Sequence, residues 1–342
     1  MIGVTVKYRH CQNAEISGEN NLKYLITGGA GFIGHNVTRF LEAQGHEVYV
    51  IDTLTDYGFI PKKEIKYLAD HRKKRIQAQV IPVDIRNVDR IDNIFAAVKP
   101  DVVIHMASFP RQKVVEQNPL LASDVMTTGL MNLLEASRSH KVTKFVYISS
   151  SMVYGDFEAD VDETATCNPI GQYGIMKYMG EKLVEDYSRR GCFEHVIIRP
   201  SAVYGEWDVE DRVVSKFMTK AMRGETLKVN GPDEVLDFTY VEDTAMGIVL
   251  AATLDAANGK IYNITRSEKR QWNLKDAAEL AIKISGQGSV EIAPRDLSFP
   301  KRGRLDISRA QRDLGYNPTV TVNEGFRKYY EWYQQNPVLW RR

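Results

Sequence analysis

The stretch ITGGAGFIG, residues 26–34, places four glycines directly after an apolar run and directly before a helical pattern. Gly29, Gly31 and Gly34 satisfy G-x-G-x-x-G, and Gly28, Gly31 and Gly34 also satisfy G-x-x-G-x-x-G. Glycine permits positive φ and lets the backbone approach a phosphate, while free N–H groups at a helix start favour an anion. The stretch therefore predicts a strand, a tight turn and a helix able to hold a pyrophosphate. A glycine-rich turn without a ligand is the alternative that this stretch alone leaves open.

Apolar runs and amphipathic segments alternate on both sides of this turn. Strands alternating with helices predict an α/β fold, here a Rossmann-type doubly wound parallel sheet with a smaller interlaced C-terminal substrate lobe. The expected strands are 24–27, 47–52, 79–84, 101–107, 144–150, 195–200 and 260–265, and the expected helices include 32–44, 87–98, 119–140, 174–190, 212–223, 273–285 and 321–335.

The rhythm changes after Pro200, where turns become frequent. We therefore expect residues 22–199 to form a dinucleotide-binding domain, to which residues 236–265 return. The substrate lobe would comprise residues 200–235 and 266–335, and residues 1–21 form a polar N-terminal extension.

Composition excludes several classes of protein. Of the 342 residues, 43% are hydrophobic and 26% charged, and the formal net charge is +1, which gives no electrostatic footprint for nucleic acid or an anionic membrane. No run reaches the length of a membrane span, and the first 21 residues lack the apolar stretch of a signal peptide. Cys11, Cys167 and Cys192 form no zinc spacing and no disulfide framework, so we expect a cytoplasmic protein without a metal.

Two acidic residues end predicted strands. Asp52 lies 18 residues beyond Gly34, where a carboxylate accepts both ribose hydroxyls of an adenosine and repels a 2′-phosphate. Because residues 53–55 supply no arginine, NAD is favoured over NADP as the cofactor. Asp84 is interpreted either as an acceptor for the adenine edge or as a helix N-cap beside Arg86 and Asn87.

A second pair of motifs, YISSSMVYG (147–155) and QYGIMK (172–177), carries candidate catalytic groups. Tyr173 and Lys177 are four residues apart and share a face of a helix. An ammonium and an oxidised nicotinamide ring would both favour the phenolate, so that Tyr173 accepts a hydroxyl proton as hydride leaves the same carbon. Ser150, at the end of a neighbouring strand, would hold that hydroxyl in line.

These motifs together resemble the extended short-chain dehydrogenase/reductases, and specifically the NAD-dependent nucleotide-sugar epimerases and dehydratases. The resemblance covers roughly residues 22–335. It is carried by TGGAGFIG (27–34), VID (50–52), DIR (84–86), HMA (105–107), SSSMVYG (149–155), YGIMK (173–177), RPSAVYG (199–205), DFTYVEDTA (237–245) and LDISRAQRDLGYNP (305–318).

The resemblance implies residue roles. The catalytic residues would be Ser150, Tyr173 and Lys177. Cofactor-binding residues would be Gly28, Gly31, Phe32, Ile33, Gly34, Asp52, Asp84, Ile85, Ala107, Tyr173 and Lys177. Substrate-binding residues would be Arg111, Ser150, Ser151, Met152, Ser201 and Arg302.

The resemblance also implies a nucleotide-diphosphate sugar as substrate, because Lys301, Arg302 and Arg304 resemble the segment that supplies a phosphate-binding arginine. A solvated basic loop is an equal alternative for any one of these residues. Family members are typically homodimers joined by a four-helix bundle, which here would use helices 119–140 and 174–190. Met176, Met179, Leu183 and Tyr187 fit either that interface or the core.

The residues after Ser150 indicate which reaction follows oxidation at C4 of the sugar. In the resembling 4,6-dehydratases the next two positions are Asp-Glu, which expel water; here they are Ser151 and Met152. Serine is a poor general acid and methionine transfers no proton, so elimination is disfavoured and a C4 epimerase is favoured. A C4 dehydrogenase and a non-catalytic dinucleotide sensor are the alternatives. Met126 and Ser201 stand where the family usually has asparagine.

Overall fold

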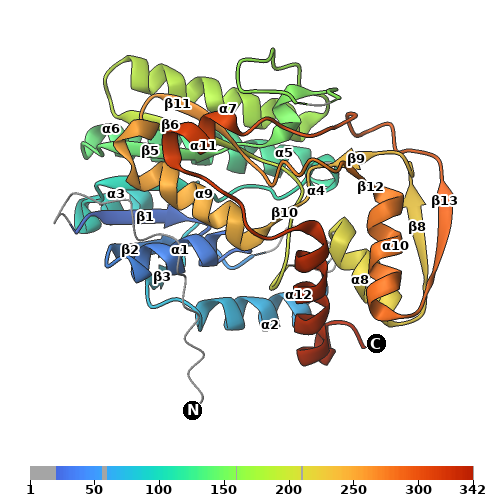
Figure 1. Ribbon diagram of the computed structural model, residues 1–342. Helices are drawn as coiled ribbons and strands as arrows, with labels where there is room; N and C mark the ends of the chain where they lie inside the picture. The colour runs from blue at the N-terminus through green and yellow to red at the C-terminus, as the bar shows by residue number, and fades with distance from the viewer. Residues whose placement is uncertain (1–20, 56–59, 159, 209–210, 342) are drawn as a thin grey trace.

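A parallel sheet forms the centre of the protein. The structure is a computed structural model that describes residues 21–55, 60–158, 160–208 and 211–341, so residues 1–20 of the expected extension lie outside the described residues. Seven strands lie in the order β11-β6-β5-β4-β1-β2-β3, and each neighbouring pair is parallel. Figure 1 shows helices on both faces of this sheet. The predicted fold class, a doubly wound parallel α/β sheet, is confirmed.

Strand β1 shows why the strands read as unbroken apolar runs. Tyr24 and Ile26 pack into one core with α1 (Gly34–Ala43) and α9 (Val241–Thr253). Leu25 packs into a second core with α3 (Val88–Val98), α6 (Gly129–Ser139) and α7 (Gln172–Arg189). Both faces of the sheet are therefore buried, as expected for parallel strands covered by helices. The seven strands are β1 (Lys23–Thr27), β2 (Glu47–Ile51), β3 (Gln79–Ile81), β4 (Val102–His105), β5 (Lys144–Ile148), β6 (Glu194–Pro200) and β11 (Lys260–Ile264).

The strand order reverses between β1 and β4. From β1 the chain continues to β2 and β3 at one edge of the sheet, and from β4 it continues to β5, β6 and β11 at the other. Such a switch point lies at the carboxyl ends of the strands and is where α/β proteins bind their ligands. The helices around it are α1 (Gly34–Ala43), α9 (Val241–Thr253) and α11 (Ser308–Leu314) on one face. On the other face lie α3 (Val88–Val98), α4 (Gln112–Gln117), α5 (Pro119–Ser123), α6 (Gly129–Ser139) and α7 (Gln172–Arg189).

A third core builds the C-terminal end of the molecule, at the right of Figure 1. Helices α8 (Val213–Met222), α10 (Leu274–Ser285) and α12 (Val322–Gln335) pack there beside the parallel pair β8 (Thr226–Asn230) and β13 (Ser289–Ala293). Short strand pairs join this end to the rest of the chain. They are β7 (Val203–Tyr204) with β10 (Thr239–Tyr240), and β9 (Val235–Leu236) with β12 (Trp272–Asn273). Short 3₁₀ helices cover Ser151–Tyr154, Asp255–Ala257 and Pro337–Leu339.

The expected single helix over 119–140 is wrong in one respect. A π-helical turn, Asp124–Thr128, separates α5 from α6. Directly after this turn Gly129 packs against Ile85, and a Cβ added to Gly129 would lie 2.5 Å from the Ile85 side chain. The π-helical turn places the first residue of α6 against Ile85, where only a glycine fits. A 3.6-residue hydrophobic pattern does not reveal such a turn.

Helix α2 (Lys62–Lys73) was not expected from the sequence. Charged residues dominate it, and its buried residue, Leu68, packs into the third core rather than into the sheet. The Tyr67 hydroxyl donates to Asn336 Oδ1 over 2.7 Å, which ties α2 to the end of α12. A helix held by so few buried side chains gives little hydrophobic periodicity to detect.

Candidate active site at the switch point

The glycine turn is built as the fingerprint predicts. Gly28 has φ of +72°, and a Cβ there would come within 2.8 Å of the Ala107 backbone nitrogen. Gly34 faces the Gly28 carbonyl oxygen so closely that a Cβ would overlap it, and a Cβ on Gly31 would lie 3.0 Å from the same oxygen. The turn therefore leaves no room for a side chain at Gly28 or Gly34 and little at Gly31, and β1, β4 and the start of α1 meet there.

The turn offers donors to an anion. In the part of the chain that the structure describes, the backbone N–H groups of Phe32 and Ile33 have no hydrogen-bond partner, and α1 has no side-chain cap at Ile33. Unpaired N–H groups at a helix N-terminus attract phosphate through both hydrogen bonding and the helix dipole. The residues present thus fit the pyrophosphate of a dinucleotide.

Asp52 lies at the same turn, beside the end of β2. Its Oδ2 accepts from the Ala30 N–H over 3.1 Å and its Oδ1 accepts from the Leu54 N–H over 2.8 Å. Burial raises the pKa of Asp52, and the two backbone donors oppose that rise. Each carboxylate oxygen keeps a further lone pair, so the geometry suits the acceptance of ribose hydroxyls.

Asp84 is engaged with Arg86. Its Oδ2 lies 2.7 Å from a terminal guanidinium nitrogen of Arg86, whose other terminal nitrogen pairs with Asp124 over 2.9 Å. The hydrogen bonds from Arg86 hold the pKa of Asp84 below its usual value. The N-cap of α3 is Asn87, so the alternative reading of Asp84 as that N-cap is wrong. Ile85, 4% exposed, packs in the core, and its carbonyl accepts from Asn132.

Three groups proposed for catalysis come together between β5 and α7. The Tyr173 hydroxyl shares a side-chain hydrogen bond with Ser150. The Lys177 Nζ donates to the Ile148 carbonyl over 2.8 Å and lies 5.9 Å from the centre of the Tyr173 ring. Gln112 accepts from the Tyr173 N–H over 3.0 Å at the start of α7. The i, i+4 spacing on α7 thus brings phenol and ammonium to one face.

In the protein alone, the pKa values of Tyr173 and Lys177 differ from those that the sequence argument assumes. Burial raises the pKa of Tyr173, and the opposing influences are the Arg212 charge and the Ser150 hydrogen bond rather than Lys177. Burial lowers the pKa of Lys177 to about 7, and the charge of the Glu181 carboxylate opposes this fall. Desolvation of two neighbouring groups explains both directions, since it disfavours each charged form.

Glu181 is a neighbour that the sequence argument missed. It is completely buried four residues beyond Lys177, and Arg199 donates to both its carboxylate oxygens over 2.9 and 2.7 Å. Ser149 donates to the same carboxylate. The spacing Tyr173, Lys177, Glu181 along one helix face was the signal that could have found it.

Arg212 was also missed. It stands at the N-cap of α8, pairs with Asp208 over 2.9 Å, and lies 5.5 Å from the centre of the Phe32 ring. Nothing in the local sequence marks it, because its closeness to the glycine turn arises only when the C-terminal end folds back.

The proposed substrate residues fall into two groups. Ser151, Met152 and Ser201 are buried beside the end of β5 and of β6, and the Ser201 hydroxyl has no hydrogen-bond partner among the described residues. Arg111 pairs with Asp211 over 2.7 Å. Arg302 keeps a buried Nε without a partner within the described chain, and burial lowers its pKa to about 10. Met126, 3% exposed, lies in the π-helical turn and packs in the core.

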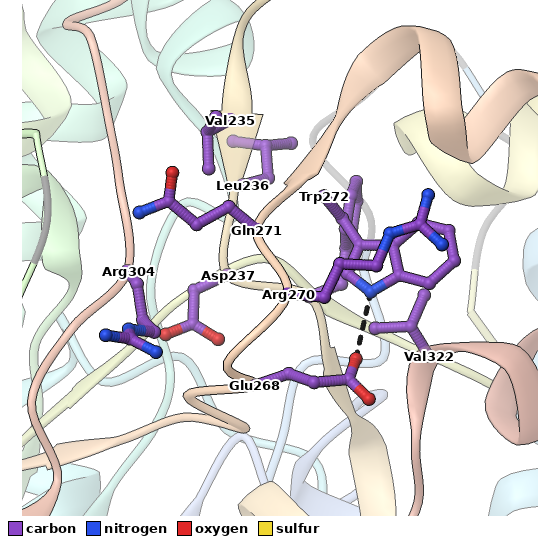
Figure 2. A pocket seen from close by; sticks show the side chains of 10 residues that line it. Val235, Leu236, Asp237, Glu268, Arg270, Gln271, Trp272, Arg304 and Val322 are labelled. Carbon is purple, nitrogen blue, oxygen red and sulfur yellow. Dashed lines mark hydrogen bonds between the residues drawn. The ribbon is translucent and has the colours of Figure 1, made fainter.

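Figure 2 shows a small pocket elsewhere, in the C-terminal region. Asp237, Glu268, Arg270, Trp272 and Arg304 line it, and Trp272 Nε1 donates to Glu268 over 2.9 Å. Its described lining contains none of the three proposed catalytic residues. The Asp237 carboxylate accepts from the backbone N–H groups of Ser267 and Leu305, which ties the pocket to the segment that follows Arg302.

Across 21–55, 60–158, 160–208 and 211–341, no set of three or more His, Cys, Asp or Glu side chains is arranged to hold a metal ion. No described helix combines the length and apolar character needed to cross a membrane.

The chain is similar to known proteins along most of its length. A putative UDP-glucose 4-epimerase from Methanocaldococcus jannaschii is 31% identical over 321 residues, which cover 91% of this chain and 98% of that protein. A dTDP-glucose 4,6-dehydratase from Neisseria meningitidis is 28% identical, covering 93% and 95%. The crystal structure of UDP-glucuronic acid 4-epimerase from Bacillus cereus, in complex with UDP-glucuronic acid and NAD, has a TM-score of 0.83 at 28% identity, covering 92% and 100%.

A family model agrees with these similarities and with the geometry of the glycine turn. The model described as the NAD dependent epimerase/dehydratase family matches residues 24–265, which span β1 to the end of the sheet. This match confirms the expected cofactor, NAD, and the expected relationship to nucleotide-sugar enzymes. The chain belongs to the NAD dependent epimerase/dehydratase family.

Proposed function

We propose that the protein is an NAD-dependent nucleotide-sugar 4-epimerase that acts through a transient 4-keto sugar. The observation that carries this proposal is the sequence Ser150-Ser151-Met152 at the end of β5, where Ser151 and Met152 are 2% and 5% exposed. Serine is a poor general acid and methionine transfers no proton, so these two positions do not supply the acid that assists elimination of water. Oxidation at C4 followed by return of the hydride needs no such acid.

In this proposal the glycine turn and the N-terminus of α1 hold the pyrophosphate of NAD, and Asp52 accepts the ribose hydroxyls. Bound NAD would supply the hydride acceptor and the hydride donor for C4 of the sugar. The Tyr173 oxygen takes the proton of the C4 hydroxyl and gives it back, while Ser150 holds that hydroxyl by a hydrogen bond. Lys177 favours the phenolate when it is charged. Because the reaction restores every group, one bound cofactor serves many turnovers.

The diphosphate of the substrate would be held by Arg302, and Arg111, on the loop after β4, is the second candidate. The unpaired Nε of Arg302 supports this role, since a buried N–H donor without a partner is costly and a phosphate oxygen satisfies it. For Arg111, a substrate phosphate would have to compete with its ion pair to Asp211. Ser201 offers a buried hydroxyl without a partner among the described residues.

We further propose a cytoplasmic homodimer joined through α5, α6 and α7. Leu120 on α5 and Ile175 on α7 support the interface, because their side chains are 86% and 52% exposed. Tyr187, 3% exposed, belongs to the core instead. Cys167 and Cys192 are both free thiols, which accords with a reducing compartment.

The experiment that tests the proposal is a screen of UDP-, GDP-, CDP- and dTDP-hexoses with product analysis by NMR. An inverted C4 supports epimerisation. Accumulation of a 4-ketone with stoichiometric NADH would replace the proposal with a C4 dehydrogenase. Loss of water would contradict the reading of Ser151 and Met152, and a protein that binds NAD but turns over none of these sugars would be a sensor.

A further inference from the structure

The end of β5 is fixed to α7 at three successive residues. Ser150 shares a hydrogen bond with Tyr173, Ile148 accepts from Lys177 over 2.8 Å, and Ser149 donates to Glu181. On α7 the partners stand at i, i+4 and i+8, so one helix face meets one strand end. Two of these contacts involve the proposed proton-transfer groups, and the third involves a residue with no assigned role.

The third contact continues into β6. Arg199, at the end of that strand, forms a two-pronged ion pair with Glu181 and lies 4.7 Å from the centre of the Tyr154 ring. Glu181, Arg199 and Ser149 are all at most 2% exposed. Such a pair contributes little stability compared with apolar side chains of equal size, because desolvation offsets its attraction. Its presence beside the active site therefore calls for a role other than stability.

The charges around Lys177 indicate that role. Its ammonium faces the Tyr147 ring at 5.3 Å and the Tyr173 ring at 5.9 Å, and His105 lies on the neighbouring strand β4. Burial holds the pKa of His105 near 3, so this imidazole is neutral, and burial raises the pKa of Tyr147, so that phenol is neutral too. Among the described ionisable groups, Glu181 is the one whose charge favours the charged form of Lys177.

We propose that Glu181 is a positioning residue of the active site, whose carboxylate keeps Lys177 charged and fixes Ser149, and with it Ser150, against α7. Arg199 holds the carboxylate in place from β6. This inference rests on the proposed function, because Lys177 and Ser150 act only if Tyr173 transfers the proton.

The test uses the full chain loaded with NAD and the nucleotide sugar that it epimerises. Glu181→Gln keeps the shape and the hydrogen bond to Ser149 but removes the charge. We expect kcat at pH 7 to fall tenfold or more while KM changes less than threefold. The basic limb of the kcat–pH profile, where Lys177 loses its proton, should move down by about one pH unit or more, because an opposite charge nearby typically shifts a pKa by that amount.

A second variant answers the objection that Arg199 is left unpaired and unfolds the protein. Glu181→Gln combined with Arg199→Met removes both charges and leaves no unpaired guanidinium buried, so we expect it to regain thermal stability. A wild-type kcat–pH profile in Glu181→Gln itself would overturn the inference, because the pair would then be structural. The control is Tyr187→Phe, on the same helix as Glu181. It removes a hydroxyl contact to Glu135 on α6 and should lower stability without moving the profile.

A readout independent of turnover separates this inference from the proposed function. The pKa of Lys177 is measured from the pH dependence of its chemical labelling, followed by mass spectrometry, in wild type and Glu181→Gln. An unchanged lysine pKa in an active epimerase would refute the inference alone. A lowered lysine pKa in a protein that epimerises no nucleotide sugar would refute the function and leave the role of Glu181 standing.

Discussion

The Arg212 guanidinium lies 5.5 Å from the centre of the Phe32 ring, although 180 residues separate the two in the chain. Phe32 belongs to the glycine turn and Arg212 begins α8, so the C-terminal region places a positive charge over the proposed cofactor site. The same charge acts on Tyr173, where it opposes the rise in pKa that burial causes. The glycine turn and the start of α8, which are far apart in the chain, thus meet beside the proposed proton-transfer site.

Removal of this charge should make Tyr173 a weaker acid. In Arg212→Gln the pKa of the phenol rises, so the acid limb of the kcat–pH profile, where Tyr173 becomes protonated, moves to higher pH. At pH 7 we expect kcat to fall about tenfold, which corresponds to a pKa shift of about one unit. Arg212→Lys should restore much of the loss, and Lys216→Gln, on the exposed side of the same helix, is the control. An acid limb that stays in place would show that Arg212 has no electrostatic role.

Replacing the proposed base separates binding from chemistry. Tyr173→Phe removes the oxygen that exchanges the proton but keeps the ring that packs against the core. We expect NAD to remain bound, as measured by calorimetry, while turnover falls by a factor of about 10² or more. Wild-type rates from this variant would reject Tyr173 as the base.

Asp237 predicts a specific pH dependence of folding. Its side chain is 6% exposed, and burial raises its pKa from 3.8 to about 6. The folded state therefore binds a proton that the unfolded state has already released, so this residue's contribution to stability falls as pH rises between these values. The full loss is ~3 kcal/mol, at 1.36 kcal/mol for each pKa unit.

The measurement compares wild type with Asp237→Asn, which does not titrate, by urea unfolding between about pH 4 and 7. The free energy of unfolding of wild type minus that of the variant should decrease across this range. Asp70→Asn, on the exposed side of α2, serves as the control and should show no such trend. A constant difference between wild type and Asp237→Asn would show that Asp237 titrates normally.

The sequence predicted the sheet because strands buried on both faces leave unbroken apolar runs, and Tyr24, Leu25 and Ile26 are an example. It predicted the meeting of Tyr173 with Lys177 because helix spacing is local. It could not predict Arg212 beside Phe32, since that contact depends on how the C-terminal region folds back. The sequence did not predict helix α2 for a related reason. Leu68 is buried by another region of the chain, so α2 has no hydrophobic periodicity of its own.

The exposed apolar residues of α5 and α7 predict how two copies associate. Leu120 and Ile175 are 86% and 52% exposed, and an aspartate at either position would place a charge inside a helical interface. We expect wild type to sediment as a dimer and the double variant Leu120→Asp with Ile175→Asp to sediment as a folded monomer at micromolar concentration. Leu297→Asp, equally exposed at 78% but outside these helices, is the matched control and should remain dimeric. A dimer that persists in the double variant would place the interface elsewhere. A monomeric wild type would show that there is no dimer interface.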